Sequence, residues 1–356
     1  MPASLASHGA LVHPHQMEIQ DFNLYALLID ARRPEAYSDD HIPGAVNVPV
    51  VSTGAAPLSL QPASPTVAEP ALAMPYELAD HVNALASDDL VLVYCDRGGL
   101  DSEVWARPLR AAGFRVDVLG GGWGNYRRWV DAGLTALPRA LSFRHLIAPP
   151  VSGLCRVLGV LAKQGQQVLD ISELAGQRLV PGLTLRCDAP PSQAAFETQL
   201  LERLRRFDPD LPVWVRVGPA PLDGLVLPPA LREAIERCDS VRLEVPLAER
   251  ARAWFERMQS MKTSLAALIE ALGTSALPPS PAHIQQWDSL GQAGQTLDAL
   301  AGIIDGYIDP TNTVGDAVMA CRVVHLPSLD TDAVVQTVRD WLRGEPLAAP
   351  AAQMRN

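Results

Sequence analysis

Short runs of apolar residues alternate with amphipathic segments along the first part of the chain. The apolar runs predict strands of a buried parallel sheet, and they lie at 26–30, within 41–49 and at 89–94. A further strand is predicted at 115–119. Between them, apolar residues at helical spacing predict helices at 34–39, 75–86, 102–112 and 126–132. This order of elements predicts a parallel sheet with helices on both faces.

A second alternation follows, with more interruptions. We expect strands at 141–147 and 211–215, and a helix that begins after Ser192, a good N-cap residue. The segment 251–301 is predicted to be helical, with loops at 273–281. Residues 51–70 are rich in Pro, Ser, Thr and Ala, which is typical of a flexible loop.

Length and composition indicate a folded protein with more than one domain. A chain of 356 residues suggests about two domains, and 48% hydrophobic against 19% charged residues supports a sizeable core. The expected organisation is an N-terminal arm at 1–20, a first α/β domain at 21–138, a second α/β domain at 139–250, a helical C-terminal region at 251–345 and a tail at 346–356.

The charge balance and the apolar runs limit the partners. A net charge of −11 argues against a dedicated nucleic-acid coat but leaves room for a local basic face. A run of about 18 apolar residues, as a transmembrane helix needs, does not occur. The N-terminus also lacks the charged start and apolar stretch of a secretory signal. We therefore expect a cytoplasmic protein without a membrane partner.

The cysteines indicate neither a metal site nor a disulfide framework. Five are spread along the chain without a CxxC pair, at Cys95, Cys155, Cys187, Cys238 and Cys321. No metal is therefore predicted, and free thiols fit a reducing compartment.

Cys95 is the chemical centre of the first domain. It ends the strand 89–94 and opens a glycine-containing loop, which consists of Asp96, Arg97, Gly98, Gly99, Leu100, Asp101 and Ser102. Such a loop can direct backbone N–H groups at the sulfur, and the following helix adds its positive end, so both favour the nucleophilic thiolate. Gly98 and Gly99 allow the positive φ angles of a cradle, and Arg97 can stabilise an anion. The alternative is a cysteine that merely ends a core strand.

Three segments together resemble a rhodanese domain: 28–32, which contains Asp30 and Arg32, 41–47, and the Cys95 loop. The resemblance implies that Cys95 carries sulfur or selenium as a persulfide or selenosulfide, with Asp30 and Arg32 in support. Tyr94-Cys-Asp-Arg-Gly-Gly-Leu-Asp-Ser102 is most similar to one branch, the tRNA 2-selenouridine synthases, whose loop reads Tyr-Cys-x-Arg-Gly-Gly-x-Arg-Ser. Asp101 stands where that pattern has a second arginine, which weakens anion binding.

The second domain resembles the same family in outline, which implies a P-loop-NTPase-like fold. The family's phosphate loop, G-x-x-x-x-G-K-[ST], corresponds to a stretch that starts at Ala148 and ends at Gly153, Leu154 and Cys155. Leu154 replaces the lysine, Cys155 replaces the hydroxyl residue, and two prolines lack N–H groups. We expect a degenerate loop that binds no nucleoside triphosphate. Cys155 is interpreted as a packed cysteine, with a second sulfur site at a helix start as the alternative.

The resemblance implies a sulfur or selenium transferase in which Cys95 serves the modification of a wobble uridine in tRNA. Selenophosphate or another sulfur or selenium donor is then a substrate, tRNA a partner, and no cofactor is required. Two alternatives remain open: a sulfurtransferase that does not act on tRNA, and a non-catalytic paralogue that serves as a binding module.

Overall fold

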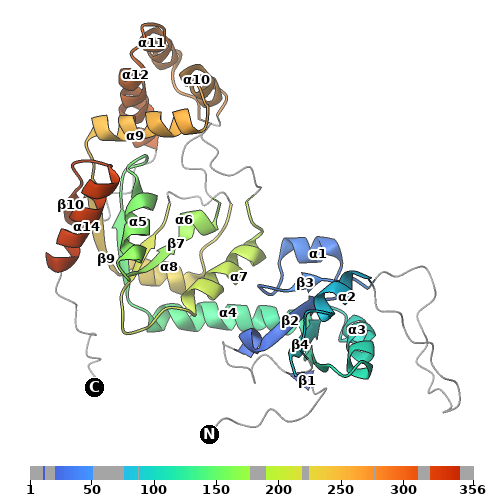
Figure 1. Cartoon of the computed structure of the whole chain (residues 1–356). Coiled ribbons are helices and arrows are strands. Elements are labelled where there is room, and N and C mark those ends of the chain that lie inside the picture. The colour runs from blue at the N-terminus through green and yellow to red at the C-terminus, as the bar shows by residue number, and fades with distance from the viewer. Residues whose placement is uncertain are drawn as a thin grey trace, which may run out of the picture. The chain divides into compact units, whose positions relative to one another are not determined.

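The chain forms two compact units, Met1–Gly133 and Leu134–Asn356, each of which is described by itself. The computed structural model describes residues 11–12, 21–50, 76–86, 88–176, 190–218, 224–275, 277–311 and 321–344. The loop predicted at 51–70 and Cys187 lie outside these residues. Each unit contains one five-stranded sheet with helices packed around it (Figure 1).

The first unit has a parallel sheet in the order β1-β5-β4-β2-β3. Its strands are β1 (Leu11–Val12), β2 (Tyr25–Asp30), β3 (Val46–Asn47), β4 (Leu90–Tyr94) and β5 (Arg115–Leu119). Its helices are η2 (Asp21–Leu24), α1 (Pro34–Asp39), α2 (Tyr76–Val82), α3 (Leu100–Ala111) and the first part of α4 (Gly122–Ala140). Strand β4 is central, and its residues 91–94 are fully buried, which explains their continuous apolar run.

Two expectations for this unit need correction. The N-terminal arm was predicted without structure, yet Leu11–Val12 pair with β5. The helix predicted at 126–132 extends over Gly122–Ala140. Tyr126, Val130 and Leu134 are buried at four-residue spacing, so the apolar stripe continues beyond the predicted end.

The second unit also has a parallel sheet, in the order β10-β9-β6-β8-β7. Its strands are β6 (Phe143–Ile147), β7 (Gln167–Asp170), β8 (Val213–Arg216), β9 (Asp239–Glu244) and β10 (Cys321–His325). The helices between and after them are α5 (Leu154–Lys163), α6 (Ile171–Leu174), α7 (Gln193–Leu204), α8 (Pro229–Glu236) and α14 (Thr331–Gly344). The prediction of an α/β fold with parallel sheets is thus confirmed.

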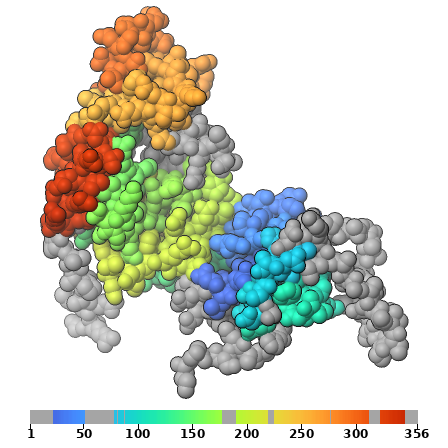
Figure 2. Space-filling model, viewed as in Figure 1, coloured from blue at the N-terminus to red at the C-terminus, as the bar shows by residue number. Residues whose placement is uncertain are grey.

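The core of the second unit lies between the sheet and the pair α5 and α14, which pack side by side (Figures 1 and 2). Leu158 and Leu161 of α5 and Val338 of α14 belong to this cluster. The predicted helix start at Ser192 is confirmed, because its hydroxyl accepts a hydrogen bond from the N–H of Ala195 at 3.0 Å.

The C-terminal region is largely helical, as expected, with one exception. Four helices and a short π-helical turn build a separate apolar cluster around Trp254 and Trp287. These elements are α9 (Leu247–Ser260), α10 (Leu265–Gly273), α11 (Pro281–Gln292), α12 (Thr296–Ile303) and the π-helical turn η3 (Ile304–Ile308). The short helix α13 (Asp309–Thr311) follows η3 directly. The exception is β10, which returns to the sheet beside β9. Val324 is buried there while Arg322 and Val323 are exposed, so no apolar run marks this edge strand.

Candidate functional site

Cys95 follows β4 at the point where the strand connections of the first sheet reverse direction. The chain leaves β2 toward β3 on one side, and it leaves β4 toward β5 on the other side. The carboxyl ends of such neighbouring strands border the usual ligand crevice of open α/β sheets. Asp30, the last residue of β2, pairs in register with Tyr94, so the topology brings Asp30 and Cys95 to the same edge.

The loop after Cys95 has the backbone geometry of a cradle. Gly98 and Gly99 have φ angles of 62° and 92°, and Gly99 is the N-cap of α3. Among the residues that the structure describes, the N–H groups of residues 96–99 have no hydrogen-bond partner. They are available to an anion at the N-terminus of α3, which is itself positive.

The backbone of Cys95 is fixed from the opposite side by the start of α4. The carbonyl of Cys95 accepts a hydrogen bond from the N–H of Trp123 at 2.9 Å. Gly122 has φ 52°, and a Cβ at this position would lie 2.1 Å from the same carbonyl oxygen. The run Gly120–Gly122 predicts a tight loop, but the sequence does not show that this loop contacts Cys95, because the two segments are distant along the chain.

Asp30 and Arg32 form a fully buried ion pair behind the loop. Arg32 Nη2 lies 2.7 Å from Asp30 Oδ2, and the guanidinium also donates to the carbonyl of Asp40 at 2.6 Å. It stacks 3.7 Å above the ring of Trp123. Burial lowers the pKa of Arg32, but the hydrogen bond and charge of Asp30 outweigh it, so the pKa is raised. Arg32 therefore acts as a permanent structural cation.

Tyr94 completes this buried layer. Its hydroxyl accepts a hydrogen bond from the N–H of Ile42 at 3.1 Å, and its ring stacks near Trp123. Burial, followed by the charge of Asp30, raises the pKa of Tyr94 well above its ordinary value. The layer under the loop is thus rigid, and its charged groups already have partners.

The predicted loop residues fall into buried and exposed groups. Cys95 and Ser102 are fully buried, and the Ser102 hydroxyl has no hydrogen-bond partner among the residues that the structure describes. Asp96 and Leu100 are exposed. Arg97 is 60% exposed and pairs with Asp101 at 3.5 Å, so the substituted Asp101 faces the cation that was expected to hold a substrate.

The stretch 148–155, which is predicted to be a degenerate phosphate loop, contacts other residues of its own unit. Val151 and Gly153 have φ angles of 61° and 69°, and Gly153 is the N-cap of α5. Arg250 donates to the carbonyl of Pro150 at 2.7 Å and pairs with Asp309. Ala148 and Leu154 pack against the apolar core. Cys155 is exposed, contrary to its interpretation as a packed residue.

Two features are absent from the described part of the chain. No three His, Cys, Asp or Glu side chains there are grouped closely enough to hold a metal ion. None of the helices described is both long and apolar enough to cross a lipid bilayer.

Comparison with known proteins agrees with this architecture. Residues 16–128 match the rhodanese-like domain family. The first unit is therefore a rhodanese-like domain, with Cys95 at the head of its loop. The chain is also 24% identical over 293 residues to the tRNA 2-selenouridine synthase of Nitrosomonas europaea, which covers 78% of this chain and 74% of that protein. The chain is thus similar to a rhodanese-like domain over its first unit and to a tRNA 2-selenouridine synthase over most of its length.

Proposed function

We propose that this protein is a rhodanese-type transferase in which Cys95 carries sulfur or selenium to a wobble uridine of tRNA. The rhodanese-like domain and the relative in Nitrosomonas europaea support a transferase role. The relative's name supports tRNA as the acceptor. The observation that carries the proposal is the position of Cys95 at the switch point of the first sheet, below a loop with unused N–H groups.

The first step of the proposed chemistry, the loading of Cys95, is one nucleophilic displacement on sulfur. The Cys95 thiolate attacks the outer sulfur of a donor persulfide, R–S–S⁻. The new S–S bond forms at Cys95, the donor S–S bond breaks, and R–S⁻ leaves with the electron pair. The loop N–H groups of residues 96–99 stabilise the negative charge of the terminal sulfur.

Ser102, in the first turn of α3, is proposed to help stabilise the terminal sulfur on Cys95. Its hydroxyl is fully buried and lacks a hydrogen-bond partner in the described part of the chain, which is costly unless an acceptor is present in some state of the protein. In our proposal it donates to the chalcogen on Cys95. Arg97 has a lesser role, because its pairing with Asp101 reduces the charge it offers to a donor.

The test is mass spectrometry of tRNA nucleosides from a deletion strain that carries wild type, Cys95→Ser or Cys155→Ser. Wild type and Cys155→Ser should restore a 2-thio- or 2-selenouridine derivative, and Cys95→Ser should not. Sulfur bound to the Cys95 peptide should be measured on the same proteins. Loaded Cys95 with unchanged nucleosides would identify a sulfurtransferase that does not act on tRNA. Unloaded Cys95 and unchanged nucleosides would identify a non-catalytic binding module.

A further inference from the structure

A second thiol, Cys155, lies where three adjacent strands of the second sheet end. It is the second residue of α5, which follows β6. Arg216, the last residue of β8, donates from Nη1 to Cys155 Sγ at 3.0 Å. The same Nη1 lies 3.0 Å from Oδ2 of Asp170, the last residue of β7. The exposed thiol thus touches a guanidinium at the positive end of a ten-residue helix, and both interactions are stronger with a thiolate.

Arg216 has hydrogen-bond donors that a ligand beside Cys155 can use. Its side chain is 6% exposed, and only Nη1 has hydrogen-bond partners among the residues that the structure describes. Nε and Nη2 are not among the fully buried side-chain atoms that lack a partner, so both reach solvent and can donate to a bound anion. Asp170 supplies one oxygen only, because its Oδ1 accepts from the N–H of Glu173 at 3.1 Å.

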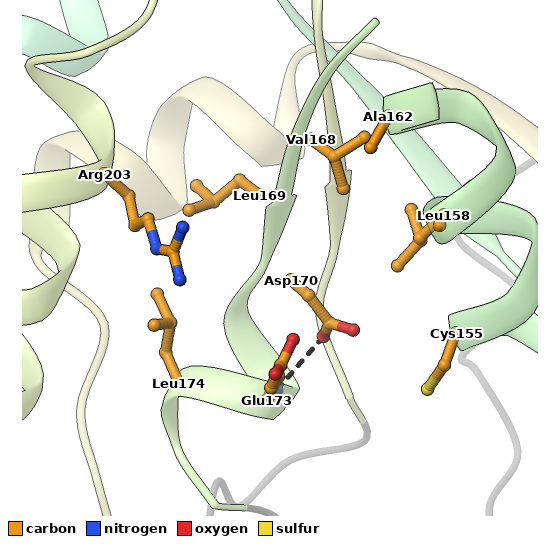
Figure 3. A pocket seen from close by; sticks show the side chains of 10 residues that line it. Cys155, Leu158, Ala162, Val168, Leu169, Asp170, Glu173, Leu174 and Arg203 are labelled. Carbon is orange, nitrogen blue, oxygen red and sulfur yellow. Dashed lines mark hydrogen bonds between the residues drawn. The ribbon is translucent and has the colours of Figure 1, made fainter. Parts of the chain in front are cut away.

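A pocket of about 270 Å³ opens beside this cluster (Figure 3). One wall is α5, with Cys155 and Leu158, and the opposite wall is formed by β7 and α6. Arg203 of α7 also lines the pocket, and Figure 3 shows its guanidinium directed inward. The volume suits a small molecule rather than a nucleotide or a peptide.

We propose that Cys155 is a second reactive thiol, which takes sulfur from a small anionic sulfur donor bound through Arg216 and Arg203. The thiolate attacks the outer sulfur of the donor, and with thiosulfate the step is Cys155–S⁻ + S–SO3²⁻ → Cys155–S–S⁻ + SO3²⁻. The S–S bond of the donor breaks, and sulfite leaves with the electron pair. The unused N–H groups of Arg216 hold the oxygens of the donor.

The site is independent of Cys95, so the experiment uses the full-length Cys95→Ser protein. It is incubated with thiosulfate, and the Cys155 peptide is examined for the addition of one sulfur atom. We expect sulfur on Cys155 and none on Cys238. Arg216→Gln should slow loading by about tenfold or more, the effect of losing hydrogen bonds to a charged group. Arg232→Gln, an exposed arginine on α8, is the matched control and should load like the parent.

A second measurement needs no substitution near the thiol. The rates of Cys155 labelling by anionic iodoacetate and neutral iodoacetamide are compared in the folded and the urea-denatured chain. Folding should raise the iodoacetate-to-iodoacetamide ratio, because the guanidinium attracts the anionic reagent. An unchanged ratio, or an Arg216→Gln protein that loads sulfur as fast as its parent, would overturn the proposal. Neither outcome depends on whether Cys95 acts on tRNA.

Discussion

At the scale of single residues, the buried arginines Arg32 and Arg216 differ in how many of their N–H groups have partners. In the rhodanese-like unit Arg32 is buried with Asp30, and its guanidinium makes hydrogen bonds from both Nε and Nη2. The second unit buries Arg216 with only Nη1 engaged among the described residues. Arg32 is thus held by its protein partners, whereas Arg216 is paired with Asp170 and keeps accessible N–H groups that an anion can use.

The buried pair of Asp30 and Arg32 is predicted to stabilise the fold. Asp30→Asn keeps the shape of the side chain and removes its charge, which leaves Arg32 buried without a counter-ion. We expect a loss of about 3–5 kcal/mol in the free energy of unfolding. Urea titration with hydrogen exchange of the β2 and β4 peptides measures it. Arg107→Gln, which removes an exposed pair with Glu103, should cost less than about 1 kcal/mol. Equal losses in both variants would contradict the structural role of Asp30.

The labelling rate of the Cys238 thiol is predicted to depend strongly on pH. Burial raises the pKa of its thiol to about 11. Only the thiolate reacts with iodoacetamide, and its fraction grows tenfold per pH unit below the pKa. The labelling rate of folded Cys238 should therefore rise by about tenfold per unit from pH 8 to pH 10, whereas an ordinary thiol with a pKa of about 8.5 levels off over this range. Labelling that levels off by pH 9 would be inconsistent with the raised pKa.

At the scale of elements, the proposed site depends on the close contact between the start of α4 and the backbone of Cys95. Gly122→Ala places a Cβ against the Cys95 carbonyl and strains a positive φ. We expect a loss of about 2–4 kcal/mol and reduced sulfur loading of Cys95. Gly124→Ala lies in the same helix with open space around it, so it should be neutral or stabilising by up to about 1 kcal/mol. Thermal unfolding and mass spectrometry of the Cys95 peptide compare the two variants.

The loop 148–153 is predicted not to bind a nucleoside triphosphate. Pro149 and Pro150 have no N–H groups, Leu154 packs into the core, and Arg250 holds the carbonyl of Pro150. Addition of Mg-ATP to the full-length protein should therefore produce no heat of binding in calorimetry and no shift in thermal unfolding. Binding with micromolar affinity that is lost on substitution in this loop would contradict the prediction.

The same elements show what the sequence reveals and what it hides. A buried strand such as β4 is predicted well, because residues covered on both faces are apolar without interruption. The edge strand β10 is missed, because only one of its faces is covered. Cys95 can be predicted as a site residue because its loop follows directly in the sequence. The contact of Cys155 with Arg216 cannot be predicted in this way, because 61 positions separate the two residues and only the strand order brings them together.

At the scale of the whole molecule, the two units have separate cores, which predicts separate responses to core damage. Leu109 of α3 and Leu161 of α5 are both fully buried leucines in helices, one in each unit. Truncation of either to Ala should cost about 2–5 kcal/mol. In hydrogen-exchange measurements, Leu109→Ala should reduce protection of β2 and β4, and Leu161→Ala should reduce protection of β6 and β9. Only α4 runs across the boundary at residues 133–134, so its amides should respond to both variants. Loss of protection throughout the chain from either substitution would show instead that the two units unfold as one.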